Sequence, residues 1–259
     1  ATGLVLIGRE AGKAITTGSQ NTALGYDAMQ KTTTGGNNVG LGFRALFSNT
    51  SAYNNTAVGF EAGYDNSTGG NNTLVGYRAG YENTTGASNV AVGLQSFFQN
   101  TTGGKNTAIG QQALQANTTA SFNTAVGYQA GYSNTTGTSS TYIGEISGYS
   151  TTGGLNTFIG EQAGYYVTTG SKNTILGRYN GNQGGLDIRT SSNNIVLSDG
   201  AGNPRMYYDN GNSVWNKNVK AFADYRYYNA SFPASTDVDI FTGVPNGNYW
   251  LVLVGGGTY

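Results

Sequence analysis

The sequence predicts an all-β protein, a β-solenoid of eleven coils of about 17 residues each, followed by a small irregular β region. Three observations lead to this prediction. A glycine closes a short apolar run at a constant spacing, the residue before that glycine is always aliphatic, and a segment rich in Asn, Thr and Gly separates successive runs. Short β-branched runs that alternate with turn residues are typical of strands joined by tight turns.

The marker glycines give the length of the repeat. They are Gly8, Gly25, Gly42, Gly59, Gly76, Gly93, Gly110, Gly127, Gly144, Gly160 and Gly177. Successive positions differ by 17, except that Gly160 follows Gly144 after only 16. The turn Gly148–Gly153 lacks the Asn that the preceding coil has at Asn134. A stack of coils tolerates a deletion best within a turn, so the shorter step is consistent with a solenoid.

Within each coil, β-branched residues predict a short strand. Val126 precedes its marker glycine, as an aliphatic residue does in every coil, and Thr124 lies two residues earlier, where Thr or Val always stands. We expect one face of this strand to point inward, and a small residue three positions after the glycine to lie where a larger side chain does not fit. Two short strands and two turns would fill a coil, whereas a propeller blade needs about 40 residues. Coils stacked at about 4.8 Å would form an array on the order of 50 Å long.

Each predicted coil is thin, with only two or three inward apolar side chains. Such a chain has a poor core for its surface, so we expect the aliphatic and Ala columns to need a partner. An oligomer whose coils pack around a common axis, most simply a homotrimer, meets this need.

Composition excludes several classes of function. Lys plus Arg and Asp plus Glu balance at 13 each, which disfavours a nucleic-acid or anionic-membrane partner. The chain has no Cys and no His, and its Gly-rich stretches lack the Lys-Ser/Thr of a phosphate-binding loop. No apolar run approaches the roughly 18–20 residues of a membrane span. We therefore expect no enzymatic activity, no cofactor, no metal site and no membrane insertion.

The best-formed unit, Asn-Thr-Ala-Val-Gly-Tyr-Gln-Ala-Gly at residues 123–131, resembles two known kinds of repeat. It resembles most the arrays of phage tail-fibre proteins, and it is similar to the head repeats of trimeric autotransporter adhesins. Either resemblance implies a left-handed parallel β-roll that forms a homotrimer, and it covers about residues 1–180. Residues 194–206 resemble the segment that ends such arrays in tail fibres, and residues 237–250 resemble the opening of pyocin-knob-like fibre tips. We recognise no heptad stalk and no membrane-anchor barrel in the residues given, so we expect the phage resemblance to be the better of the two.

The period fails near residue 180, which divides the chain into three expected parts. Residues 1–180 form the solenoid array, residues 181–220 form a capping and connecting β segment, and residues 221–259 begin a small C-terminal β domain that we expect to be truncated. A cap is expected because the end of a solenoid exposes unpaired backbone groups.

Several columns of identical residues are candidate binding features. One amide column is expected to form a structural hydrogen-bond ladder along the coils, with sugar binding as the alternative. It consists of Asn21, Asn38, Asn55, Asn72, Asn89, Asn106, Asn123, Asn156 and Asn173, and Ser140 interrupts it. An aromatic file that includes Tyr64 and Tyr81 is expected to pack between coils or subunits, with sugar stacking as the alternative.

Two further columns lie in the Asn-Thr-Thr-Gly segments. The Thr pairs are expected to form turns, and ice binding is the remote alternative because ranks of Thr on a flat face can match ice. The Asn-x-Ser/Thr sequons of these segments, such as Asn66 and Asn100, are expected to follow from the turn consensus and not to carry glycans.

Receptor recognition is expected where the repeat ends, because binding sites usually lie on irregular tips. The candidates are the non-periodic aromatic residues Tyr207, Tyr208, Tyr225, Tyr227, Tyr228 and Trp250. The expected function is that of a structural fibre protein, extracellular and on a virion tail fibre, which attaches a phage or phage-like particle to a host. Its expected partners are two further copies of itself and a host cell-surface glycan or protein receptor. The alternative is a trimeric adhesin head on a bacterial cell surface that binds host matrix or glycans.

Overall fold

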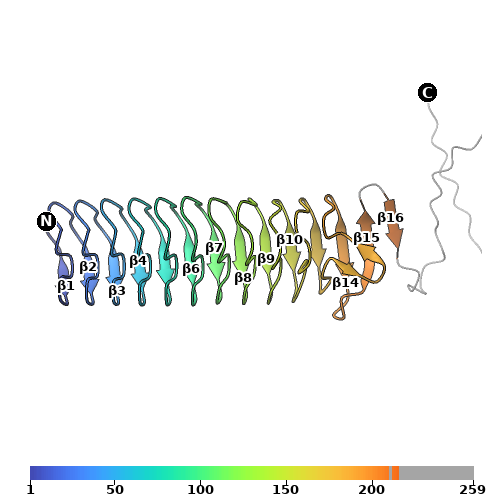
Figure 1. The fold of residues 1–259 in the computed structure, drawn as a ribbon, viewed down its shortest axis with the longest axis horizontal. Helices are drawn as coiled ribbons and strands as arrows, with labels where there is room; N and C mark the ends of the chain where they lie inside the picture. The colour runs from blue at the N-terminus through green and yellow to red at the C-terminus, as the bar shows by residue number, and fades with distance from the viewer. Residues whose placement is uncertain (210–211, 216–259) are drawn as a thin grey trace, which may run out of the picture. The chain divides into compact units, whose positions relative to one another are not determined.

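The computed structural model describes residues 1–209 and 212–215, and it contains no helix in this part of the chain. Eleven three-residue strands follow one another at the repeat spacing (Figure 1). They are β1 (Val5–Ile7), β2 (Thr22–Leu24), β3 (Val39–Leu41), β4 (Thr56–Val58), β5 (Thr73–Val75), β6 (Val90–Val92), β7 (Thr107–Ile109), β8 (Thr124–Val126), β9 (Thr141–Ile143), β10 (Thr157–Ile159) and β11 (Thr174–Leu176). Five more strands complete the described part: β12 (Asn182–Gln183), β13 (Leu186–Asp187), β14 (Ile195–Ser198), β15 (Pro204–Asp209) and β16 (Asn212–Trp215).

The strands β1–β11 form one parallel sheet in sequence order. Each residue pairs with its equivalent one coil later, as Thr107 pairs with Thr124. The prediction of an all-β solenoid of about eleven coils is therefore confirmed, and equivalent residues such as Asn106 and Asn123 are 17 residues apart. The parallel pairing also continues beyond residue 180, because β14 adds to β11 with Thr174 opposite Ile195. The antiparallel strands β15 and β16 then cover the edge of β14.

Each coil contains one strand where the sequence predicted two. The other side of each coil consists of turns, in which several non-glycine residues have a left-handed backbone, among them Leu46 (φ 52°) and Phe97 (φ 55°). The prediction of two strands per coil is wrong. The left-handed residues in these turns change the chain direction so often that no second segment has the extended backbone of a strand. The inter-coil hydrogen bonds nevertheless continue through them, as in the bond from the Leu114 N–H to the Ala130 carbonyl (3.0 Å).

The inward face of each strand carries only its middle residue. Ala57, Ala91 and Ala125 are fully buried, whereas the aliphatic residue at the end of each strand lies on the outward face, where Ile109 is 40% exposed. This arrangement follows from alternation, since the first and third residues of a strand share one side. The predicted column of small residues after the marker glycine is buried as expected, with Ala62 and Ala113 among its members.

The narrow core is lined by the strand on one side and by the turns on the other, and a large residue on one side faces a small residue on the other. A β-carbon on Gly63 or on Gly80 would lie 2.7 Å from a δ-carbon of Leu74, so the turns beside a large strand residue carry glycine. The opposite case occurs at Gly40 in β3, where a β-carbon would lie 3.1 Å from Cε of Met29 in the neighbouring turn. The interior therefore holds little more than one large side chain at each level.

The marker glycines allow neighbouring coils to approach closely. Gly93 has φ +131°, and a β-carbon there would lie 2.6 Å from the carbonyl oxygen of Gly110 in the next coil. A side chain at this position would therefore be strained and would also push the coils apart.

One coil is one residue shorter than the others. In this coil Thr151 takes the buried position that Asn134 has in the coil before, so the missing residue comes from the Thr pair.

Candidate functional site

The predicted asparagine column lies inside the solenoid. The Asn106 Nδ2 atom donates to the carbonyl of Ala120 (2.9 Å), and the Asn106 Oδ1 atom accepts the backbone N–H of Asn123 (2.9 Å). The same pattern recurs from Asn21 to Asn173 and reaches Asn194, and these asparagine side chains are at most 1% exposed. At the break, the Ser140 hydroxyl accepts the N–H of Asn156 (3.1 Å). Because these amides are buried and already bond to backbone groups, a sugar in solution cannot reach them.

The sequon asparagines form a second buried column. Asn66, Asn83, Asn100 and Asn117 are fully buried, and the Asn117 Nδ2 atom donates to Oδ1 of Asn100 (2.9 Å). A glycan could not be attached to these side chains in the folded chain. The Asn column of the turn therefore serves packing between coils.

The two residues of each Thr pair have different surroundings. The first lies half-buried, and its hydroxyl donates to a carbonyl of the next coil, as Thr101 does to Thr118 (3.0 Å). The second is exposed in nearly every coil, as Thr102 and Thr119 are. Only one Thr file of the turn therefore faces solvent.

The aromatic residues stack along the array. Tyr64 and Tyr81 lie 5.1 Å apart with their rings 8° from parallel, and Phe47 and Phe98 continue the file on either side. A second file joins Tyr26, Phe43, Phe60 and Tyr77. Inside a file, both faces of a ring are covered by its neighbours, so only its edge is available to a ligand. Stacking on a sugar needs a free ring face, which favours inter-coil packing as the role of these files.

Glu61 and Arg78 belong to a column of charged residues that runs beside the two aromatic files just described. Arg78 donates from Nε to the carboxylate of Glu61 (2.8 Å), and this bond raises the pKa of Arg78. The Arg78 guanidinium also lies 5.3 Å and 5.2 Å from the ring centres of Tyr77 and Tyr81. Charge pairing along this column fits a role in the alignment of successive coils.

The six aromatic residues predicted to bind a receptor do not form one site in the described part of the chain. Tyr207 packs partly buried against the core, opposite the fully buried Val196, whereas Tyr208 lies opposite Ile195 and is 43% exposed. Adjacent residues of a strand face opposite sides, which separates the two rings. Tyr225, Tyr227, Tyr228 and Trp250 lie outside the described residues.

The loop before β15 is organised by one carboxylate. Asp199 accepts the backbone N–H groups of Asn203 (2.9 Å) and Ala201 (3.0 Å), and Arg205 also donates to it (2.9 Å). The bond from the Asn203 N–H contributes most to a lowering of the Asp199 pKa to about 2. Asp199 therefore serves as an anchor for this loop and stays ionised at neutral pH.

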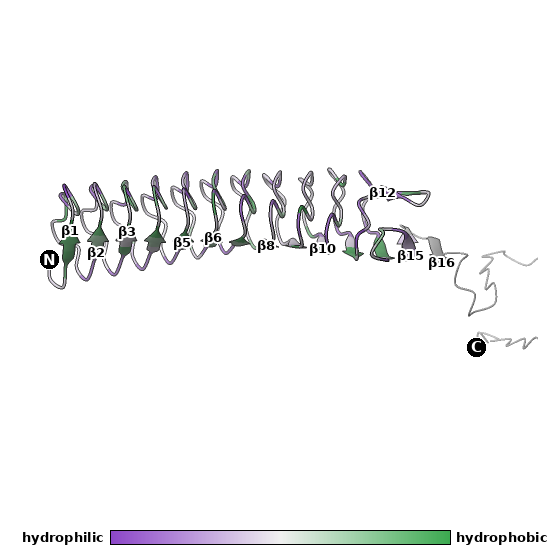
Figure 2. Cartoon of the chain, turned by 90° about the horizontal axis from the view of Figure 1, so that it is seen from below, coloured by the Kyte–Doolittle hydropathy of each residue, from purple (hydrophilic) through white to green (hydrophobic). Residues whose placement is uncertain are grey.

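The outward face of β1–β11 carries no charged residue along the array. Its first position in each strand is Thr or Val, its third is aliphatic, and neither position carries a charge in any of these strands. The third-position residues are Ile7, Leu24, Leu41, Val58, Val75, Val92, Ile109, Val126, Ile143, Ile159 and Leu176. We call these two columns the strand face. Figure 2 shows β1 and β2 in the colour of hydrophobic residues.

Two features are absent from residues 1–209 and 212–215, a cluster of metal ligands and a membrane-spanning helix. No group of three or more Asp or Glu residues is placed to hold a metal ion there, and no helix in that part is long and apolar enough to span a membrane. Comparison with protein-family models, with curated proteins and with solved structures finds no match to this chain.

Proposed function

We propose that this chain forms the shaft of a homotrimeric fibre that attaches a phage or phage-like particle to the surface of its host. The strand face is the observation that carries the proposal. It presents half-exposed aliphatic side chains in register over eleven strands without a single charge. Contiguous apolar surface of this kind is typical of protein–protein interfaces.

Further copies of the same chain are the occupants that fit this face best. Every copy has the same strip of Thr, Val and aliphatic residues at the same coil spacing, so copies arranged around an axis match coil by coil. The resemblance of the repeat to trimeric families supports three copies. Three binding tips held on one shaft would gain avidity from their high effective concentration.

The mass of the assembly in solution tests the shaft. We expect a monodisperse species of three times the 26.9 kDa chain mass. The double variant Val92→Lys with Ile109→Lys places charges on the strand face and should dissociate it, because buried unpaired charges are costly at an interface. Thr102→Lys, at an exposed turn position, is the matched control and should remain assembled. A wild-type monomer would contradict the proposal.

Attachment is tested separately, by adsorption of the labelled assembly to bacterial cells and to animal matrix proteins. Adsorption to bacteria supports the phage-type fibre. Adsorption to matrix proteins or animal cells with none to bacteria would instead favour an adhesin head carried on a bacterial surface.

Ice binding is a second candidate, because Thr stands at the first outward position in eight of the strands β1–β11, and parallel strands repeat at about 4.8 Å. A face buried between subunits cannot also bind ice. The two candidates are therefore distinguishable, since ice binding requires a species that exposes the strand face and inhibits ice recrystallisation. Loss of that inhibition in Thr107→Lys would assign it to this face.

A further inference from the structure

The regular array is interrupted near its end by a longer coil. The ladder asparagines Asn173 and Asn194 are 21 residues apart, compared with 17 between Asn156 and Asn173. The additional residues form the short hairpin of β12 and β13, in which Gln183 pairs with Leu186. The hairpin ends at Asp187, which is exposed, and is followed by the buried Ile188 and the exposed Arg189.

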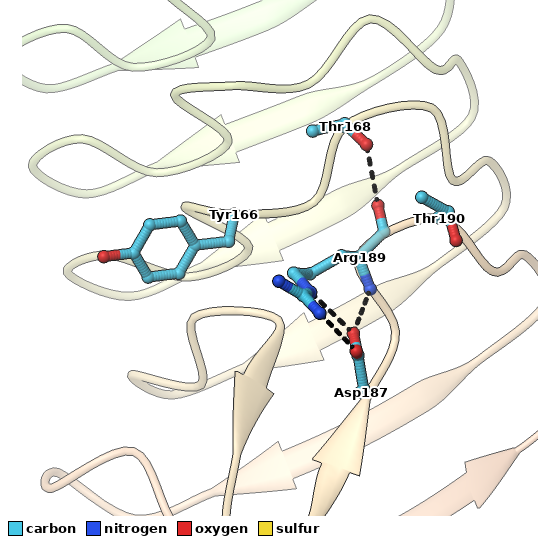
Figure 3. A pocket seen from close by; sticks show the side chains of 5 residues that line it. All are labelled: Tyr166, Thr168, Asp187, Arg189 and Thr190. Carbon is cyan, nitrogen blue, oxygen red and sulfur yellow. Dashed lines mark hydrogen bonds and ion pairs between the residues drawn. The ribbon is translucent and has the colours of Figure 1, made fainter.

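A hollow of about 370 Å³ lies beside this hairpin and is open to solvent. Tyr166, Thr168, Asp187, Arg189 and Thr190 line it. Figure 3 shows the Tyr166 ring and the Arg189 guanidinium extending to the same side from neighbouring segments. The hollow thus combines residues of a regular coil with residues of the interruption.

The polar groups of the hollow are held in place. Arg189 donates to both carboxylate oxygens of Asp187, from Nε at 3.0 Å and from Nη2 at 2.7 Å, and the backbone N–H of Arg189 donates to the same carboxylate. The pKa of Asp187 is lowered, chiefly by the side-chain bonds from Arg189. Thr168 donates from its hydroxyl to the Arg189 carbonyl (3.1 Å), which ties the two segments together.

This pair leaves bonding capacity for a ligand. A guanidinium has five N–H donors, and the carboxylate of Asp187 uses only some of those of Arg189. The pair has no net charge, so a neutral ligand with both donors and acceptors fits it better than an anion, which the carboxylate would repel. The exposed hydroxyl of Thr190 adds a further polar group at the rim.

Tyr166 supplies an apolar surface that the stacked files lack. Its side chain is 50% exposed, and its ring stands at 88° to that of Tyr165, at 4.7 Å between centres. It therefore lies outside the parallel stack of Tyr149 and Tyr165. An exposed ring next to fixed polar groups matches a pyranose, which has a C–H face and a rim of hydroxyls.

We propose that this hollow is a binding site for a neutral hexopyranose, with Tyr166 packing against the C–H face of the sugar and the Asp187–Arg189 pair bonding to adjacent hydroxyls. The proposal rests on the proposed function, since it names the chemistry that a host surface would present. A site this open gives weak binding by one chain and relies on three copies for avidity.

Ligand-observed NMR by saturation transfer tests the site directly. The probes are the methyl glycosides of glucose, galactose and N-acetylglucosamine, at up to about 50 mM, well above a millimolar Kd. At least one probe should receive saturation from the full chain. Tyr166→Ala and Arg189→Gln should reduce the signal at least tenfold, and Tyr166→Phe should keep it. Tyr53→Ala is the matched control, because Tyr53 is 49% exposed on a regular coil.

Two results would overturn the inference. One is the absence of saturation for all three probes, and the other is saturation that persists in both Tyr166→Ala and Arg189→Gln. Unchanged thermal unfolding of the variants shows that a loss of signal is local.

Adsorption to bacterial cells separates this inference from the proposed function. Cells that retain wild type and Tyr166→Ala equally would leave host attachment standing and exclude this hollow as its site. A sugar bound at Tyr166 without adsorption of the wild type to any bacterium would support the site and argue against host attachment.

Discussion

The ring of Tyr142 fills the space that a side chain on Gly131 would need. A β-carbon on Gly131 would lie 2.6 Å from Cδ2 of Tyr142, and Gly148 contacts the other side of the same ring. Tyr142 is the middle residue of β9, a position at which five of the strands β1–β11 carry Ala. The coil around it is also unusual, because Ser140 and Thr151 replace two buried asparagines. A large strand residue thus occurs together with small residues at the positions of Gly131, Gly148, Ser140 and Thr151.

This relationship predicts strong coupling between Gly131 and Tyr142. Gly131→Ala should destabilise the wild-type chain through left-handed strain of about 1–2 kcal/mol and overpacking of about 1–3 kcal/mol, since Gly131 has φ +62°. In a Tyr142→Ala background the overpacking against the ring should disappear, and only the strain and the close approach to Cδ2 of Leu114 (2.9 Å) should remain. Urea unfolding of the four chains at one concentration measures the difference, and additive effects would contradict the packing argument.

The second prediction concerns an isoleucine whose backbone has a left-handed conformation. Ile146 has φ +47°, which β-branched residues rarely adopt, and neighbouring coils place Gln129 and Gln162 at the same position. Gln129 donates to Gln112 (2.8 Å), so a glutamine at 146 could extend an existing amide file. Ile146→Gln should stabilise the fold by about 1 kcal/mol. Ile146→Val keeps the β-branch and should give no gain in thermal unfolding; an equal gain would contradict the strain argument.

The periodic columns were predictable from the sequence because identical residues recur at identical places. The strand period, the buried Ala column and the position of the turns all follow from the spacing of marker glycines such as Gly110 and Gly127. The inward strand residue was not predicted, because it varies from Ala125 to Tyr142 and so has no repeating identity. The sequence does contain a signal for it, because the sizes of two positions vary inversely. Wherever the middle residue of the strand is large, the residue four positions after the marker glycine is itself glycine.

The candidate sugar site was missed for a related reason. The hollow joins Tyr166 to Asp187 and Arg189, and a hairpin without any repeat brings them together. The available signals were the Tyr165–Tyr166 doublet and the 21-residue step between ladder asparagines. Neither signal reveals on which side of the coil the hairpin lies.

The asparagine ladder gives the third prediction. Asn106→Ala removes the acceptor for the Asn123 N–H and the donor to the Ala120 carbonyl, and both backbone groups are left buried. An unsatisfied buried group costs about 1–3 kcal/mol, so we expect the two groups together to cost about 2–6 kcal/mol in urea unfolding.

Asn106→Ser should cost less than Asn106→Ala, because the natural Ser140 still accepts an N–H from the next coil. Thr119→Ala, in an exposed turn, is the control and should stay within about 0.5 kcal/mol of wild type. Equal losses for the Ala and Ser variants at position 106 would show that the acceptor is not what the ladder needs.

The buried hydroxyl of Tyr142 gives the fourth prediction, which concerns alkaline pH. Burial raises the pKa of Tyr142 to about 12, although Ser140, Thr151 and Asn156 nearby partly oppose the shift. Among the described residues, the hydroxyl has no hydrogen-bond partner of good geometry. A tyrosine in the unfolded chain ionises near pH 10, so the folded state keeps its proton longer.

The sign of the effect follows from that difference. The stability contribution of protonated Tyr142 is complete below pH 10 and is lost as the pH rises toward about 12, by about 1.4 kcal/mol per pH unit. Tyr142→Phe should be nearly neutral at pH 7, since it removes an unpaired polar group, and should reduce the loss of stability between pH 10 and 12. Urea unfolding at pH 8 and pH 11 measures both values. Phe158→Leu disturbs the same core without removing an ionisable group and should keep the wild-type pH dependence. An identical alkaline loss in Tyr142→Phe and wild type would show that Tyr142 ionises without unfolding its coil.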